Sequence, residues 1–140
     1  MGGTDTLSKQ LAMLKKLKAR MKALPNEVGA AQGGCMAVSQ SLHLKATEFS
    51  NAVKHLEKEL SDARLMAQMY ETQVMQLQAL EKAKAAEMKK GGDEKSLAKI
   101  EKTIQQMDKA CSASHAEAES AWGRTGALVD SLKKAISKVR

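Results

Sequence analysis

The sequence predicts an all-α fold, in which a long antiparallel coiled-coil helical hairpin carries a short N-terminal amphipathic helix as a partial three-helix bundle. Composition is the first observation, because helix-forming residues dominate and only one proline is present. The second is a seven-residue apolar repeat in two segments of nearly equal length. The third is a Gly-Gly pair between these segments, which predicts a tight turn. A chain of 140 residues is expected to form a single domain.

The first predicted element is an amphipathic helix over about residues 5–24. Its apolar face carries Leu7, Leu11, Leu14, Leu17, Met21 and Leu24. Its basic surface consists of Lys9, Lys15, Lys16, Lys18, Arg20 and Lys22. Residues 25–34 (PNEVGAAQGG) contain the proline and three glycines, which favours a linker over a helix.

The hairpin is predicted to use helices over about residues 35–90 and 94–140, joined by a turn at 91–93. In the first helix, spacings of four and three connect Leu42, Ala46, Phe49, Val53, Leu56, Leu60, Ala63, Ala67, Tyr70, Val74 and Leu77. The second carries Leu97, Ile100, Ile104, Met107, Cys111, Ser114, Ala118, Ala121, Thr125, Leu128, Leu132, Ala135 and Val139. Folding at the turn is expected to place Glu59 beside Arg124.

The apolar face of the last helix widens near its end, where Val129 and Ile136 join the repeat. A stripe wider than a two-helix seam requires a third helix. We therefore expect the helix over residues 5–24 to pack there, covering only the open end of the hairpin.

Two sets of residues are predicted to bind partners. The first set lies off the hairpin seam, beyond the expected reach of the N-terminal helix, and comprises Leu65, Met66, Met69, Met75 and Leu80. Exposed methionines are typical of adaptable contact surfaces, although scattered exposure is the alternative. The second set is Trp122, Gly123 and Gly126, a bare surface that another helix can approach closely; a kink or a tolerated weak point is the alternative.

Basic charge is concentrated at one end, since the first 24 residues contain six basic side chains and one acid, Asp5. This layout indicates docking to an acidic protein, such as a cytoskeletal polymer, or to an anionic membrane. The first six residues, MGGTDT, match the N-myristoylation pattern with Gly2 as acceptor. A basic cluster is a suitable second membrane signal beside one acyl chain. A cloning remnant is the other explanation of Gly2-Gly3.

Catalytic, metal and cofactor sites are not expected. His43, His55 and His115 have neither metal-ligand spacing nor a neighbouring cysteine, and no Gly-rich phosphate loop is present. Cys35 and Cys111 form no disulfide framework, which favours a reducing, cytoplasmic location. No apolar run is long enough to cross a bilayer. The absence of aromatic residues among the N-terminal lysines disfavours nucleic acid as a partner.

These observations favour a non-enzymatic structural, scaffold or adaptor subunit of an intracellular protein assembly. Its partners would be other subunits, in a homo- or hetero-oligomer held together by coiled-coil contacts. The alternative function is that of an N-myristoylated, polybasic peripheral membrane protein.

Overall fold

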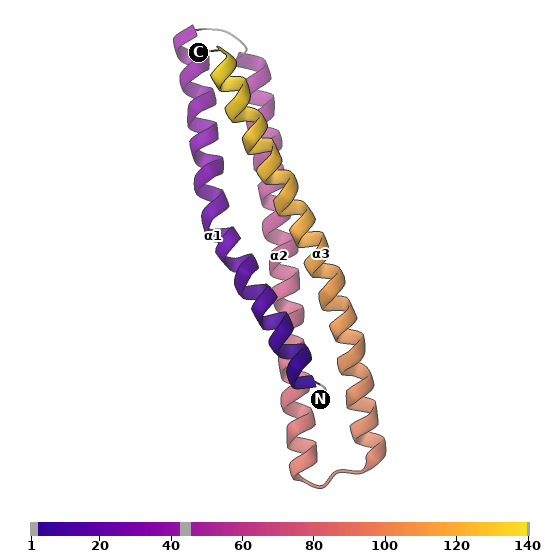
Figure 1. Cartoon of the computed structure of the whole chain (residues 1–140). Coiled ribbons are helices and arrows are strands. Elements are labelled where there is room, and N and C mark those ends of the chain that lie inside the picture. Colours follow the sequence, from indigo (N-terminus) through magenta and orange to yellow (C-terminus); the bar gives the residue numbers. More distant parts are fainter. Residues whose placement is uncertain (1–2, 43–45, 140) are drawn as a thin grey trace. The chain divides into compact units, whose positions relative to one another are not determined.

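The structure, a computed structural model, describes residues 3–42 and 46–139, with side chains over 6–38 and 48–138. Three helices account for these residues: α1 (Gly3–Leu42), α2 (Ala46–Lys89) and α3 (Glu94–Val139), shown in Figure 1. No strand occurs within the described ranges, and the helices pack closely. The predicted all-α class is therefore confirmed.

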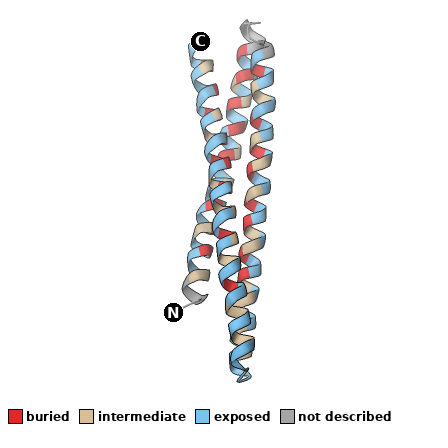
Figure 2. Ribbon diagram, turned by 90° about the vertical axis from the view of Figure 1, so that its right-hand side faces the viewer, coloured by how far each residue is buried: buried red, intermediate tan, exposed pale blue. Residues whose placement is uncertain are grey.

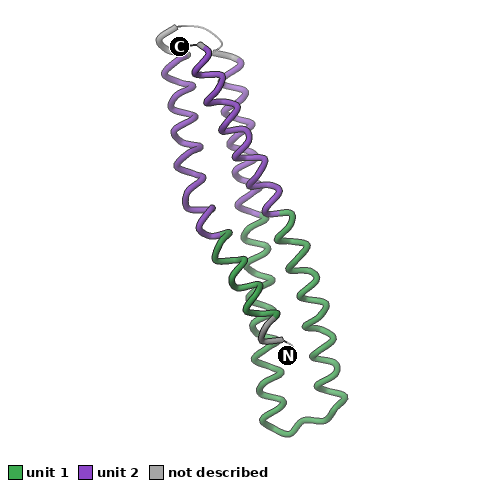
Figure 3. Tube along the Cα trace, viewed as in Figure 1, with its two compact units in different colours: residues 1–17, 66–117 green, residues 18–65, 118–140 purple. Residues whose placement is uncertain are grey.

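The described residues fall into two compact units, coloured separately in Figure 3. Unit 1 comprises Met1–Leu17 and Met66–Glu117, and unit 2 comprises Lys18–Leu65 and Ala118–Arg140. Each unit contains a segment of all three helices and has its own buried side chains. The expectation that the chain forms a single domain stays a prediction.

Helix α1 runs without interruption from Gly3 to Leu42, with Pro25 inside it. The predicted helix end at residue 24, the linker over 25–34 and the hairpin start at residue 35 are therefore wrong. A row of side chains buried at spacings of three, four or seven explains the continuity: Gln10, Leu14, Leu17, Leu24, Val28, Ala31, Cys35 and Val38. Burying one Leu or Val is worth about 1.5–3 kcal/mol. Several such residues together outweigh the helix penalties of about 3 kcal/mol for proline and about 1 kcal/mol for each glycine.

The buried faces of α2 and α3 follow much of the predicted repeat, and Figure 2 shows their positions along the ribbons. On α2 the buried side chains are Phe49, Leu56, Leu60, Ala63, Ala67, Tyr70, Val74 and Leu77. On α3 they are Ile104, Cys111, Ala118, Ala121, Trp122, Thr125, Val129, Leu132 and Ile136. The expected widening at Val129 and Ile136 is confirmed, because both side chains are buried in unit 2.

In unit 1, a glycine turn connects α2 to α3. Gly91 has a φ of 69°, and the backbone N–H groups of Gly91 and Gly92 donate to the carbonyls of Met88 (3.1 Å) and Glu87 (2.9 Å). This is the Schellman arrangement that ends many helices. Asp93 then caps α3 by accepting a hydrogen bond from the backbone N–H of Ser96 at 2.7 Å. That bond lowers the pKa of Asp93.

Contacts between α2 and α3 join residues far apart in sequence. In unit 1, Lys84 forms an ion pair with Glu101, and the rings of Tyr70 and His115 lie 5.1 Å apart. In unit 2, the Arg124 Nε donates to Glu59 Oε2 at 3.5 Å, which confirms the expected neighbour. In unit 1 the pairs 70–115 and 84–101 show that the two helices run in opposite directions, since the residue number rises on one helix as it falls on the other.

Candidate protein-binding surfaces

A buried polar cluster holds the N-terminal segment of α1 inside unit 1. The Tyr70 hydroxyl lies 2.8 Å from Gln10 Oε1 and 3.0 Å from the Gln10 carbonyl oxygen. The Gln10 amide nitrogen donates to Asp108 Oδ1 at 2.9 Å and to Ser112 Oγ at 3.2 Å. The expectation that the first helix covers only the open end of the hairpin is therefore wrong. The reason is length, because α1 has 40 residues.

Burial favours the neutral forms of two groups at this cluster, Tyr70 and Cys111, by raising the pKa of each. Burial, assisted by Cys111 and Asp108, raises the pKa of Tyr70. Burial, assisted by Asp108, also raises the pKa of the Cys111 thiol to about 11. In unit 2, burial raises the pKa of the Cys35 thiol. A nucleophilic cysteine needs the opposite shift, so both thiols have the character of core side chains.

The outward surface of α2 exposes most of the first predicted partner set. Met69 and Met75 in unit 1 are 51% and 58% exposed, whereas Met66 and Leu80 are half-buried. In unit 2, Leu65 is 57% exposed. Sequence reasoning missed Met88, which is also exposed. This surface therefore presents flexible apolar side chains to solvent.

The same stretch of α2 is almost free of charge. Within unit 1, the only charged residue from Met66 to Leu80 is Glu71. The exposed side chains there are Gln68, Met69, Thr72, Met75, Gln76 and Ala79. Charged residues make up 28% of the whole sequence. The exposed side of this stretch therefore carries less charge than the composition of the chain leads one to expect.

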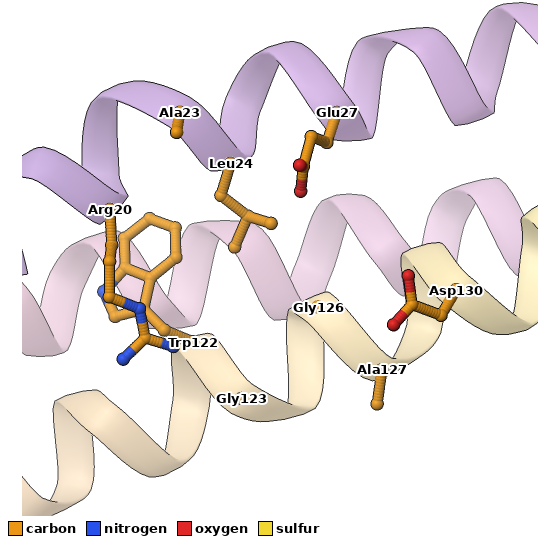
Figure 4. Close-up of a pocket in the computed structure, with 9 residues that line it drawn as sticks. All are labelled: Arg20, Ala23, Leu24, Glu27, Trp122, Gly123, Gly126, Ala127 and Asp130. Carbon is orange, nitrogen blue, oxygen red and sulfur yellow. The ribbon is translucent and has the colours of Figure 1, made fainter.

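A groove between α1 and α3 in unit 2 contains the second predicted set (Figure 4). Its volume is about 460 Å³, and it is lined by Arg20, Ala23, Leu24, Glu27, Trp122, Gly123, Gly126, Ala127 and Asp130. Trp122 is only 1% exposed, so its side chain offers little surface to a partner, and its partner-binding role stays a prediction. Arg20 and Leu24 on α1 line the groove beside Trp122, so the packing of α1 in unit 2 accounts for the burial of the indole ring. Gly123 is exposed and Gly126 half-buried.

The two ends of the groove carry different charged side chains. At one end, Arg20 forms an ion pair with Glu119. At the other, Glu27 on α1 and Asp130 on α3 are exposed, and neither carboxylate forms an ion pair in the described part of the chain (Figure 4). A Cβ added to Gly123 or Gly126 would meet nothing within 4 Å, so neither glycine is required by packing inside unit 2.

Comparisons with protein-family models, with curated proteins and with solved structures gave no match. Within the described residues, no group of three or more His, Cys, Asp or Glu side chains could hold a metal ion. No helix in those ranges has both the length and the apolar character needed to cross a bilayer. The exposed surfaces of the chain are therefore the evidence that bears on its function.

The six predicted basic side chains are all exposed on α1. Arg20 forms an ion pair with Glu119, and Lys18 also interacts with another group of the chain. The remaining four, Lys9, Lys15, Lys16 and Lys22, give α1 an outward positive surface. Gly2, the predicted myristoylation site, lies outside the described residues. The structure therefore describes the basic part of the predicted membrane signal and leaves the acylation site a prediction.

Proposed function

We propose that this chain is a non-enzymatic structural or adaptor subunit of an intracellular protein assembly, and that it binds other subunits through helix–helix contacts. The observation that carries the proposal is the outward surface of α2 in unit 1, where Met69 and Met75 are exposed. Leucine and valine side chains already fill the inward side of that helix. The exposed methionines therefore contribute little to the stability of the chain itself, and contact with a partner is the use that this composition suits.

We further propose that α2 and α3 form an antiparallel coiled coil. The support is the repeat of buried positions on α2 together with the pairing of Tyr70 with His115 and of Lys84 with Glu101. Spacings of three and four on facing helices are the condition for knobs-into-holes packing. The non-enzymatic part of the proposal is supported by the raised pKa values of Cys35 and Cys111.

Site-specific photocrosslinking tests the adaptor function. A benzophenone amino acid replaces Met69 on α2 or, as the matched control, Gln105, an exposed residue on α3 of the same unit. In living cells, we expect discrete crosslinked products from position 69 and not from position 105. Equal labelling from both positions, or none from either, would contradict the proposal.

A second candidate function is binding to an anionic surface through α1. The observation that favours it is the exposure of Lys9, Lys15, Lys16 and Lys22 on one helix. The apolar side of the same helix is buried in both units, so the lysines would bind electrostatically without insertion. The surface could belong to a membrane, with Gly2 acylated, or to an acidic protein such as a cytoskeletal polymer.

Charge reversal tests this second function. The variant Lys15→Glu/Lys22→Glu changes α1, and Lys95→Glu/Lys102→Glu, two exposed residues at the same spacing on α3, makes the same net change as a control. Binding to phosphatidylserine vesicles or to actin filaments should fall for the α1 variant and weaken with salt. If both variants bind as well as the original chain, α1 is not the binding surface. Myristoylation of Gly2 is measured separately, by mass spectrometry of the protein from its native cell.

A further inference from the structure

We infer that a second copy of this chain binds antiparallel to α2 along an outer stripe formed by Met69, Thr72, Gln76, Ala79, Ala83 and Ala86. All six residues belong to unit 1, and all six are exposed. The inference deepens the proposed function, on which it rests, because it names the partner that occupies the same surface.

The first argument is spacing. Successive residues of the outer stripe are three, four, three, four and three positions apart. This is the seven-residue repeat of a coiled-coil seam, on the side of α2 opposite Ala67, Tyr70, Val74 and Leu77, which fill the core. α2 therefore carries a second seam, which the described residues of unit 1 leave exposed.

The second argument is the distribution of size along the stripe. Its first three residues, Met69, Thr72 and Gln76, have larger side chains, and its last three are all alanine. Two copies in opposite directions would place Met69 against Ala86, Thr72 against Ala83, and Gln76 against Ala79. Every layer then joins a larger side chain to a methyl group, which keeps the helix separation even. Parallel pairing would place Met69 against Met69 and alanine against alanine, and the separation would change along the seam.

The third argument is charge. The stripe itself has none, although the chain carries a net charge of +7 and two copies repel over much of their surfaces. The antiparallel register sets Met75 near Lys82 and Met66 near Glu87 of the other copy. On the same two flanks it sets Gln68 near Lys89 and Gln73 near Leu80. No like-charged pair arises, so a second copy fits this surface electrostatically.

The expected dimer is reversible. The outer stripe covers 18 residues, or about 27 Å of helix, which gives a contact at the small end of the range for stable interfaces. Sedimentation velocity of the full chain should show the mass rising from 15.1 kDa towards twice that value as concentration increases. The variant Gln76→Lys places two lysines near the two-fold axis and should weaken association by about tenfold or more.

The matched control is Gln105→Lys, the same substitution at an exposed position on α3 of the same unit. It adds the same charge and should leave association nearly unchanged. Circular dichroism of both variants checks that the helices remain folded. Equal weakening by the two substitutions would overturn the inference, because the effect would then come from net charge alone.

Disulfide trapping tests the direction of pairing. A mixture of the Met69→Cys and Ala86→Cys variants should form the mixed disulfide under mild oxidation. Met69→Cys alone should not crosslink to itself, since two copies of position 69 would lie about 25 Å apart along the helices. Crosslinking of Met69→Cys alone would indicate parallel pairing and overturn the register. The original chain, whose Cys35 and Cys111 are buried, controls for native thiols.

The results separate this inference from the function on which it rests. A monomer at every concentration, without trapping, overturns self-association. If position 69 still gives specific photocrosslinks to a different protein, the adaptor function stands with a heterologous partner. If the photocrosslinks are also absent, both proposals fail. A dimer that is lost in Gln76→Lys and trapped only in the mixed pair supports the inference.

Discussion

The Tyr70 hydroxyl shares its proton between two oxygens of Gln10, the side-chain Oε1 at 2.8 Å and the carbonyl at 3.0 Å. The variant Tyr70→Phe removes this donor and leaves the Gln10 oxygens buried without it. We expect the free energy of unfolding to fall by about 1–3 kcal/mol, measured by urea denaturation. A double-mutant cycle with Gln10→Ala should show coupling, because the two side chains are in contact.

The control for this pair is Thr103→Val, which removes an exposed hydroxyl bonded to the Lys99 carbonyl at 3.0 Å. That change should cost less than about 0.5 kcal/mol. If Tyr70→Phe costs no more than the control, the cluster does not hold the N-terminal segment of α1 in unit 1.

Gly123 and Gly126 lie inside the continuous helix α3. After proline, glycine is the residue least favourable in a helix. Because a Cβ at either position meets nothing within 4 Å, Gly123→Ala and Gly126→Ala should each raise the free energy of unfolding by about 1 kcal/mol. Gly34→Ala is the matched comparison in the same unit, since its Cβ would lie 3.0 Å from Ile136 Cδ1 and should gain less. Thermal denaturation of the three variants measures the order, and a loss of stability in Gly123→Ala would contradict the open groove.

Stability should decrease in alkali through Cys111. Its thiol has an ordinary pKa of 9.0 in the unfolded chain, and burial raises the pKa to about 11 in the folded protein. Between these values the unfolded state binds fewer protons, so the free energy of unfolding falls as pH rises, by up to about 1.4 kcal/mol per pH unit. Below pH 9 the thiol makes no such contribution. Urea denaturation across this range should give a shallower slope for Cys111→Ala, and an unchanged slope would refute the assignment.

Pro25 lies inside α1, where its ring removes one backbone donor and crowds the preceding turn. The variant Pro25→Ala should raise the free energy of unfolding by about 1–2 kcal/mol. This is less than the full helix penalty of about 3 kcal/mol, since proline also restricts the unfolded chain. Asn26→Ala, at the exposed neighbouring residue, controls for a general gain in helix propensity. A stability loss in Pro25→Ala would indicate that unit 2 requires a bend at this position.

The periodicity of residues 46–77 and 97–139 was sufficient to predict two helices, many of their buried positions, and the neighbouring positions of Glu59 and Arg124. Leu42, the first residue of the predicted repeat, belongs to α1 instead. The apolar face of the predicted helix over 5–24 was partly wrong, because the polar Gln10 is buried and the apolar Leu11 is exposed. The continuity of α1 beyond residue 24 was missed for a different physical reason. Pro25 and the glycines were weighed by intrinsic propensity, whereas burial of Val28, Ala31 and Cys35 against neighbouring helices decided the outcome.

Part of each candidate surface was also predicted from the sequence. Their positions off the predicted apolar faces were sufficient to predict that Met69 and Met75 are exposed and that the lysines of α1 face outward. The outer stripe was not recognised as a repeat because five of its six residues are polar or small, and their common feature is their exposure in unit 1. Trp122 was assigned to a surface because it lies off the predicted seam of its helix, whereas α1 packs beside it in unit 2.

Each unit contains one strong ultraviolet chromophore in its interior: Tyr70 in unit 1 and the sole tryptophan, Trp122, in unit 2. Excitation at the red edge of the absorption band selects the indole, while tyrosine absorbance reports the other unit. The unlabelled protein can therefore reveal whether its two halves melt together or in succession. Because α1, α2 and α3 all pass from one unit into the other, coincident transitions would measure how strongly a continuous backbone transmits order between them.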